Sequence, residues 1–191
     1  MKNKKRISLI AFILFGLLLS ACEKDIDANM SKEMQDFSFI TQDNETLNLD
    51  DLKGEWWITY FSYTDCRTVC PRTTSNMVDI QSQLKKDGLE PPIISFNVNP
   101  EKDGPEELRK YAEENNVDLD TWDFLTGYDF ETIQNLSEQS FLAVLEKGAA
   151  EQMSHSYMFY LVNPKGEVVK KYDGMSTDEH KVLIEDLKTV L

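Results

Sequence analysis

The chain has 191 residues, and its 34 acidic residues outnumber the 20 basic ones to give a formal net charge of −14. This length suits a single domain with a sizeable buried core. The acidic balance argues against nucleic acid or anionic lipid headgroups as binding partners, because both repel a negative surface. It fits a well-solvated surface or a cationic partner.

The N-terminal segment has the features of a bacterial export signal. A positively charged start precedes an apolar stretch over 7–19, which has the length of a signal peptide and is short for a membrane span. Small residues stand directly before Cys22, an arrangement that resembles the bacterial lipobox. We therefore predict that residues 1–21 are a lipoprotein signal peptide and that Cys22 is diacylated as the mature N-terminus. The alternative is an ordinary signal peptide followed by an incidental cysteine.

Cleavage before Cys22 would remove four basic residues and no acidic one, so the net charge of residues 22–191 would fall to −18. The lipid would hold the protein at the outer face of the cytoplasmic membrane, in a compartment that permits disulfides. The polar composition predicts a tether over 22–36, followed by one folded domain over 37–191.

Hydrophobic patterning predicts the elements of this domain in chain order. A β-hairpin over 37–49 comes first, and a buried strand over 57–61 follows it. A helix starts at Thr73 and stops at Gly88, with lysines in its last turn. A second apolar strand covers 93–98, and Asp103 can cap the helix after it.

The second half of the domain continues the alternation. A short strand over 122–125 precedes a helix that begins near Phe130, and residues 147–153 are predicted to form a loop. Strands over 157–162 and 167–172 pair as an antiparallel hairpin, and a capping box at Ser176 starts the final helix. This order predicts an α/β, thioredoxin-like fold with an added N-terminal β-hairpin and a central insertion.

Two of the three cysteines lie four residues apart, at the junction between a predicted strand and a predicted helix. Positions i and i+4 of a helical turn are about 5–6 Å apart between Cβ atoms, so Cys66 and Cys70 can hold one metal ion or form a redox disulfide. The first turn of a helix favours the thiolate. Arg67 and Arg72 add positive charge while Asp65 opposes it, and we expect a lowered thiol pKa.

A third metal ligand is offered by His155, just before the predicted strand over 157–162. In a thioredoxin-like fold the start of this strand faces the cysteines, which makes His155 a candidate, although a lone histidine is more often structural. His180 has no cysteine nearby and is predicted to lie on the surface. Two thiolates and one imidazole suit copper, as Cu(I) or Cu(II), better than structural zinc, which takes four protein ligands.

Several segments together give the chain a resemblance to the Sco/SenC family, the copper-binding assembly proteins of cytochrome c oxidase. The resemblance extends from about Phe37 to the end and is greatest to the membrane-anchored lipoproteins of Gram-positive bacteria. The segments that carry it are Leu52-Lys53-Gly54, Cys66-Arg67-Thr68-Val69-Cys70-Pro71, Ile94-Ser95-Phe96-Asn97-Val98-Asn99-Pro100 with Asp103, Trp122-Asp123-Phe124-Leu125-Thr126-Gly127, and His155-Ser156 with Phe159-Tyr160-Leu161-Val162 and Gly166.

The resemblance implies that Cys66, Cys70 and His155 bind copper and that the protein is a chaperone rather than an enzyme. It would deliver copper to the dinuclear CuA centre on subunit II of cytochrome c oxidase. An oxidised disulfide could not hold copper in this way, so a partner thiol reductant must keep the cysteines reduced. Two alternatives use the same dithiol, namely an extracytoplasmic thiol–disulfide reductase that acts on the subunit II cysteines and a redox or copper sensor.

The chain departs from the family pattern at two positions beside the candidate ligands. Arg67 stands where the family usually has proline, and Asn99 stands where it usually has aspartate. Loss of that carboxylate is expected to alter copper affinity or transfer rather than the three direct ligands. Thioredoxin-like oxidoreductases also share a proline just before the late strand, and residues 152–156 contain none. That absence and the Cys-x-x-x-Cys spacing weigh against a general disulfide oxidoreductase.

Overall fold

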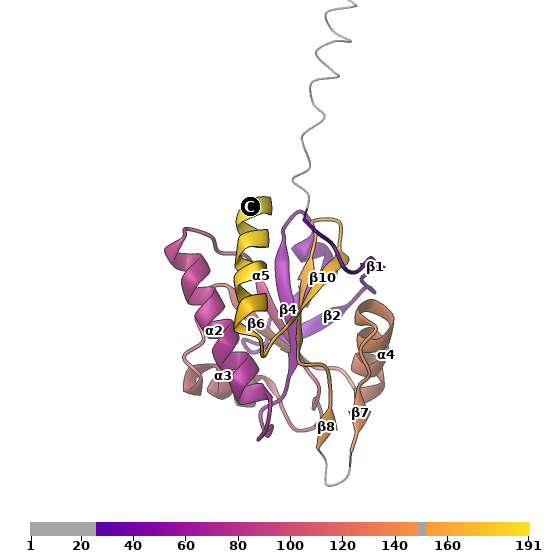
Figure 1. Ribbon diagram of the computed structural model, residues 1–191. Helices are drawn as coiled ribbons and strands as arrows, with labels where there is room; N and C mark the ends of the chain where they lie inside the picture. Colours follow the sequence, from indigo (N-terminus) through magenta and orange to yellow (C-terminus); the bar gives the residue numbers. More distant parts are fainter. Residues whose placement is uncertain (1–25, 149–151) are drawn as a thin grey trace, which may run out of the picture.

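The computed structural model describes residues 26–148 and 152–191. They form an eight-stranded mixed sheet with helices on both faces, and a separate two-stranded ribbon (Figure 1). The strands are β1 (Lys32–Glu33), β2 (Ser38–Thr41), β3 (Thr46–Asn48), β4 (Trp57–Ser62), β5 (Ile93–Asn97), β6 (Trp122–Thr126), β7 (Glu146–Lys147), β8 (Met153–Ser154), β9 (Met158–Val162) and β10 (Glu167–Asp173). The helices are the 3-10 helix η1 (Leu49–Leu52) and the α-helices α2 (Cys70–Lys86), α3 (Pro105–Glu114), α4 (Phe130–Phe141) and α5 (Thr177–Val190).

The strand order of the large sheet is β1-β10-β9-β4-β5-β6-β2-β3. Strands β4, β5 and β6 are parallel, whereas β9 is antiparallel to β4 and β2 is antiparallel to β6. Strand β4 therefore lies in the interior of the sheet, and all six of its residues are buried. A strand covered on both faces is expected to be continuously apolar or neutral, as β4 is.

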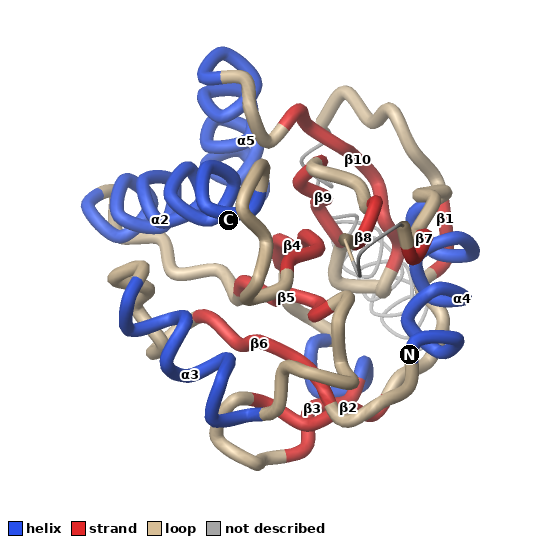
Figure 2. The backbone as a smooth tube through the Cα atoms, turned by 90° about the horizontal axis from the view of Figure 1, so that it is seen from below, coloured by secondary structure: helices blue, strands red, loops and turns tan. Residues whose placement is uncertain are grey.

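Two hydrophobic cores fill the space between the sheet and its helices. Helices α2, α3 and α5 cover one face, and α4 covers the other (Figures 1 and 2). Successive residues of β4 serve the two cores in turn, because side chains alternate across a strand. Ile58 and Tyr60 pack with α2, α3 and α5, whereas Trp57 and Phe61 pack on the side of α4. The predicted thioredoxin-like order is confirmed, with the β2–β3 hairpin at one edge and the segment from β6 to β8 inserted before β9.

The end signals of the helices act as their sequences predict. Gly88 follows α2 in the left-handed region, with φ of 77°. The Ser176 side chain accepts a hydrogen bond from the Glu179 N–H at 3.4 Å and caps α5. The Asp129 side chain, which was not among the predicted caps, caps α4 in the same way and accepts from the Thr132 N–H at 2.9 Å.

The predicted tether over 22–36 is wrong for its second half. Residues 32–33 form β1, which pairs antiparallel with β10 at the edge of the sheet. Asn29 exchanges two hydrogen bonds with the Lys171 backbone, and Met34 is buried in the core beside α4. The polar composition concealed this strand because an edge strand needs backbone partners rather than apolar side chains. Cys22 and the predicted signal peptide lie outside the described residues.

Three local predictions also differ from the structure. The two ends of the predicted loop over 147–153 are paired instead. Strands β7 and β8 form an antiparallel ribbon in which Lys147 lies opposite Met153. The helix predicted from Thr73 begins at Cys70, one turn earlier, with Pro71 in its first turn. The cap of α3 is Gly104, and Asp103 has another role, described below. Within the described part of the chain, no helix combines the length and apolar character needed to cross a membrane.

Candidate metal centre

The topology of the sheet brings the cysteine loop and His155 together. Strands β4 and β9 are antiparallel neighbours, with Trp57 opposite Val162 and Thr59 opposite Tyr160. The end of β4 and the start of β9 therefore lie side by side, at the same end of these two strands. Cys70 and His155, 85 positions apart in the sequence, become neighbours for this reason.

The three sequence-predicted ligands form one compact group. The Cys66 Sγ, the Cys70 Sγ and a ring nitrogen of His155 all lie within 4.8 Å of one another. The Cys70 Sγ lies 3.3 Å from the His155 Nε2. In the described ranges, this is the group of cysteine, histidine and carboxylate side chains placed to hold a metal ion. Both thiols are free rather than joined as a disulfide.

Cys66 lies before α2 rather than within it, and its sulfur faces the helix start. The Cys66 Sγ accepts a hydrogen bond from the Cys70 N–H at 3.3 Å, which is one of the unpaired donors of a helix N-terminus. The Cys70 thiol hydrogen bond lowers the pKa of Cys66 most, burial acts in the opposite direction, and the Thr68 and Cys70 backbones lower it further. The same bond and then burial raise the pKa of Cys70. These opposite shifts favour a thiolate at Cys66 over one at Cys70.

The predicted contribution of the two arginines to this lowered pKa is not what the structure shows. Arg67 and Arg72 are exposed, and neither is among the main causes of the Cys66 shift. The Arg67 guanidinium instead lies 3.5 Å from the exposed Asp65 carboxylate. A screened surface pair of this kind adds little to a buried thiolate.

The surroundings of His155 define which ring nitrogen faces the cysteines. The Nδ1 atom lies 2.8 Å from the Ser156 carbonyl oxygen, an acceptor, so Nδ1 carries the proton in the neutral ring. The Nε2 lone pair then points to the Cys70 sulfur. The Tyr63 ring meets the imidazole edge to face, at 5.7 Å between centroids. Metal-binding histidines are commonly fixed in this way, through a hydrogen bond from the other ring nitrogen.

A buried carboxylate, that of Asp103, holds the start of the cysteine loop. Asp103 is 2% exposed, and its two oxygens accept from the Thr64 N–H at 2.9 Å and the Thr64 hydroxyl at 2.6 Å. Burial raises the pKa of Asp103, although the Thr64 bonds act in the opposite direction. The sequence offered an α3 cap for this residue, and only the fold reveals that it faces Thr64.

The structure also places the other residues that the sequence singled out. Asn99 is buried and lines a cavity with Met153, two residues before His155. His180 is not a plain surface residue, because its ring packs against Phe159 at 5.6 Å between centroids and its buried Nε2 has no hydrogen-bond partner among the described residues. Met153 and Met158 are partly buried and pack against the core on the α4 side.

The fold and this site define a thioredoxin-like protein with a two-cysteine, one-histidine centre beside the end of β4 and the start of β9. The SCO1/SenC family model matches residues 27–191, and the chain belongs to that family. It is 38% identical to the SCO1 protein homolog of Bacillus subtilis (strain 168) over 182 residues, which cover 95% of this chain and 94% of the relative.

Solved structures agree with this assignment. A SCO1/SenC family lipoprotein from Bacillus anthracis has a TM-score of 0.81 and 34% identity, covering 85% of this chain and 98% of that one. BsSco, a member of the Sco family of cytochrome c oxidase assembly proteins with a disulfide switch, has a TM-score of 0.79 and 38% identity, covering 86% and 96%. Arabidopsis thaliana ScoI with copper bound has a TM-score of 0.70 and 24% identity, covering 82% and 97%, which is a likeness of fold.

Proposed function

We propose that the protein is a copper chaperone that binds one copper ion through Cys66, Cys70 and His155 and delivers it to the CuA centre on subunit II of cytochrome c oxidase. The observation that carries the proposal is the convergence of two sulfurs and one ring nitrogen within 4.8 Å. Membership of a family that includes a cytochrome c oxidase assembly protein supports the oxidase as its destination.

The donor set favours copper over the other common metals. Soft thiolates and an imidazole bind Cu(I) well and can also hold Cu(II). Two thiolates and a neutral imidazole form a neutral complex with Cu(II) and an anionic one with Cu(I). Structural zinc takes four protein ligands, and the described residues supply three here. A three-ligand site also leaves a position through which a receiving thiolate could approach the ion.

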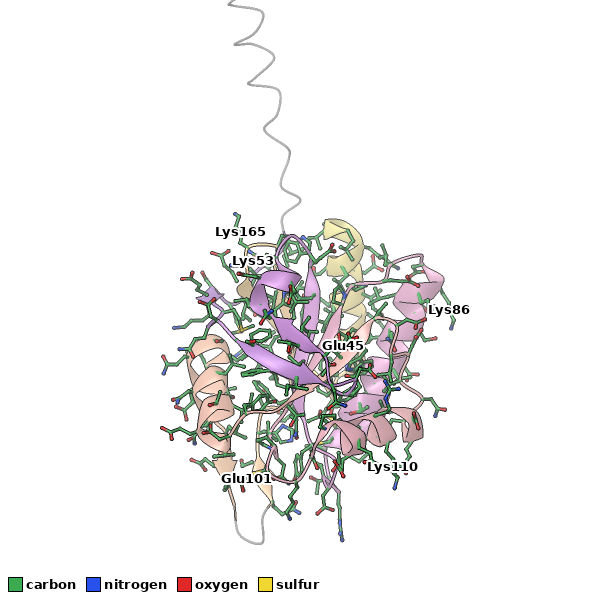
Figure 3. The ribbon with its side chains drawn as sticks, turned by 180° about the vertical axis from the view of Figure 1, so that it is seen from behind. Glu45, Lys53, Lys86, Glu101, Lys110 and Lys165 are labelled. Atoms are coloured by element: carbon green, nitrogen blue, oxygen red, sulfur yellow. The ribbon has the colours of Figure 1, made fainter. Side chains whose placement is uncertain are left out.

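The location of the site fits a membrane-anchored carrier. The described chain begins at the end of the domain opposite the β7–β8 ribbon, which immediately precedes His155 (Figure 1). Figure 3 shows the same two ends from behind, with Lys53 and Lys165 at one and Glu101, which pairs with Lys147 of β7, at the other. A lipid on Cys22 would hold the first end at the extracytoplasmic face of the membrane. The copper site would then face away from the lipid, towards a partner domain.

A second candidate is a thiol–disulfide reductase acting on the cysteines of oxidase subunit II. The asymmetry of the two thiols favours it, because a thiolate at Cys66 beside a protonated Cys70 is the arrangement of a nucleophile and its resolving partner. The disulfide switch of BsSco belongs to the same chemistry. A redox or copper sensor would use this dithiol as well.

A His155→Ala variant separates the chaperone from the reductase. Removing the imidazole takes away one copper ligand and leaves both thiols in place. If the protein delivers copper, cells that carry this variant should assemble little active oxidase, while the purified variant still exchanges disulfides at the wild-type rate. Full recovery of oxidase activity with His155→Ala would contradict the chaperone proposal and favour the reductase. Cys66→Ala should abolish both activities and serves as the control.

A further inference from the structure

A chain of hydrogen bonds runs from His155 to a tyrosine in the core. The His155 Nδ1 is held by the Ser156 carbonyl oxygen at 2.8 Å. The Ser156 hydroxyl oxygen lies 2.8 Å from the Tyr160 hydroxyl oxygen and accepts from the Met158 N–H at 3.2 Å. Ser156 therefore touches the imidazole with its backbone and β9 with its side chain.

Tyr160 is a rigid end point for this chain. It is 2% exposed, and its ring packs with Phe141 at 4.8 Å and with Phe61 at 6.3 Å between centroids. Its backbone is paired on both sides, with Thr59 of β4 and Lys171 of β10. Burial raises the pKa of Tyr160, so the hydroxyl stays protonated at neutral pH. A hydroxyl on an interior strand of the sheet moves much less than one on a loop.

We propose that Tyr160 is a positioning residue for the copper site, which through Ser156 fixes the ring orientation and the tautomer of His155. This inference rests on the proposed function. Residues 155–157 connect β8 to β9 outside the regular sheet, and the adjacent Tyr157 is 44% exposed. Without the bond between the two hydroxyls, the Ser156 peptide can turn, and the carbonyl that receives Nδ1–H turns with it. The Nε2 lone pair would then no longer be held towards the cysteines.

Two substitutions remove the link at different points and spare every proposed ligand. Tyr160→Phe removes one hydroxyl and keeps the ring in the core. Ser156→Ala removes the other hydroxyl at a half-buried position, so it tests the link even if the core variant were unstable. Tyr172→Phe is the matched control, because Tyr172 is equally buried on the next strand and its hydroxyl donates to Asp186 of α5 at 2.7 Å.

The first measurement uses the metal-free, reduced full-length protein. Nitrogen-15 chemical shifts of the His155 ring report which nitrogen carries the proton. We expect the Nδ1–H tautomer in the wild type and in Tyr172→Phe, and a mixture of tautomers in Tyr160→Phe and Ser156→Ala. The double variant Tyr160→Phe/Ser156→Ala should match Ser156→Ala, because the tyrosine hydroxyl has no further part in the link once the serine hydroxyl is gone. An unchanged Nδ1–H tautomer in both single variants would overturn the inference.

The second measurement follows copper itself, as release of Cu(II) to a chelator and as nitrogen coupling in the electron paramagnetic resonance spectrum. Lost outer hydrogen bonds typically weaken metal binding about 10–100-fold, and we expect about tenfold faster release from Tyr160→Phe and Ser156→Ala. Tyr172→Phe should release copper at the wild-type rate. Equal effects in Tyr160→Phe and Tyr172→Phe would overturn the positioning role. If the wild type showed no nitrogen coupling and released copper as fast as His155→Ala does, the proposed function would be refuted instead. The tautomer measurement would still decide whether Tyr160 orients His155.

Discussion

The carboxylate of Asp103 binds Thr64 twice, through the backbone N–H and through the side-chain hydroxyl. Thr64 stands two residues before Cys66, so this contact fixes the start of the cysteine loop. The Asp103 backbone is itself tied to the sheet, because its carbonyl oxygen accepts from the Thr126 hydroxyl at 2.8 Å and from the Asn97 side chain at 3.2 Å. The position of the first cysteine thus depends on the segment after β5 as well as on its own strand.

Asp103→Ala should destabilise the fold and loosen the cysteine loop together. It leaves the Thr64 N–H and hydroxyl without their acceptors in a buried site, which costs about 1–3 kcal/mol. We expect chemical denaturation to show a loss of this size and copper release to become faster. Asp123→Asn is the control. The Asp123 carboxylate accepts a hydrogen bond from the Gln42 side chain near the start of β6, whereas Asp103 contacts Thr126 at the end of that strand. Faster copper release in both variants would mean that the loop responds only to stability.

The raised pKa of Asp103 also predicts a pH dependence. Between the ordinary value of 3.8 and the higher folded pKa, the folded protein binds more protons at Asp103 than the unfolded chain does. This carboxyl therefore makes the fold less stable as pH rises through that window, and more stable as pH falls. We expect the wild type to gain stability relative to Asp103→Asn when pH is lowered towards 4. A difference between the two that is independent of pH would contradict the assignment.

The two thiols should react differently with an alkylating reagent. Cys66 is 7% exposed and its pKa is lowered, whereas Cys70 is fully buried and its pKa is raised. Alkylation of Cys66 should therefore be the faster reaction and should change little between pH 8 and pH 5. An ordinary thiol slows about tenfold per pH unit below its pKa. Mass spectrometry of the alkylated peptides separates the two sites, and equal rates at Cys66 and Cys70 would refute the asymmetry.

Asn99→Asp should strengthen copper binding while weakening the metal-free fold. The new carboxylate would be nearly buried beside the segment that carries His155, and a buried charge without a full set of partners is costly. Its negative charge would attract a nearby copper ion, and we expect affinity for Cu(II) to rise about twofold to tenfold. Paired copper titration and denaturation measure both effects. Unchanged affinity would show that position 99 does not act on the bound ion.

Leu142→Gly should stabilise the domain. Leu142 ends α4 in the left-handed conformation, with φ of 53°, and its side chain is 64% exposed. Glycine adopts that conformation without the steric cost that a Cβ atom brings, and little buried apolar surface would be lost. We expect a gain of about 0.5–1 kcal/mol in the free energy of unfolding. Val144→Gly, at an equally exposed position without a positive φ, should lower stability instead.

Local sequence signals were sufficient to predict the elements that depend mainly on neighbouring residues. The alternating or continuous apolar runs marked β4, β5 and β9, and the cap at Ser176 needs only neighbouring residues. The pairing of β1 with β10 could not be predicted in this way. Lys32 and Glu33 have no apolar pattern, and their strand exists only because β10 presents an open edge.

Some residues of the site could likewise be predicted from the sequence, and others only from the fold. The spacing of Cys66 and Cys70 at a strand–helix junction identified the dithiol. A lone histidine is more often structural than a ligand, so only the family resemblance identified His155 as the third ligand. The residues that hold these groups came from the fold alone. Thr64 and Asp103 are far apart in the chain, as are Cys70 and His155, and no local pattern links either pair. The serine beside His155 shows its role only when Tyr160 is placed on β9.

Copper binding by the reduced protein, compared with binding by Cys66→Ala, Cys70→Ala and His155→Ala, tests the three-ligand site directly. The three-ligand site predicts one equivalent of Cu(II) with a thiolate-to-copper charge-transfer band. That band should be lost in each cysteine variant and weakened in the histidine variant. Weak binding by the wild type, with the thiols oxidised to a disulfide instead of a copper complex, would contradict the copper site and leave the dithiol as the functional centre.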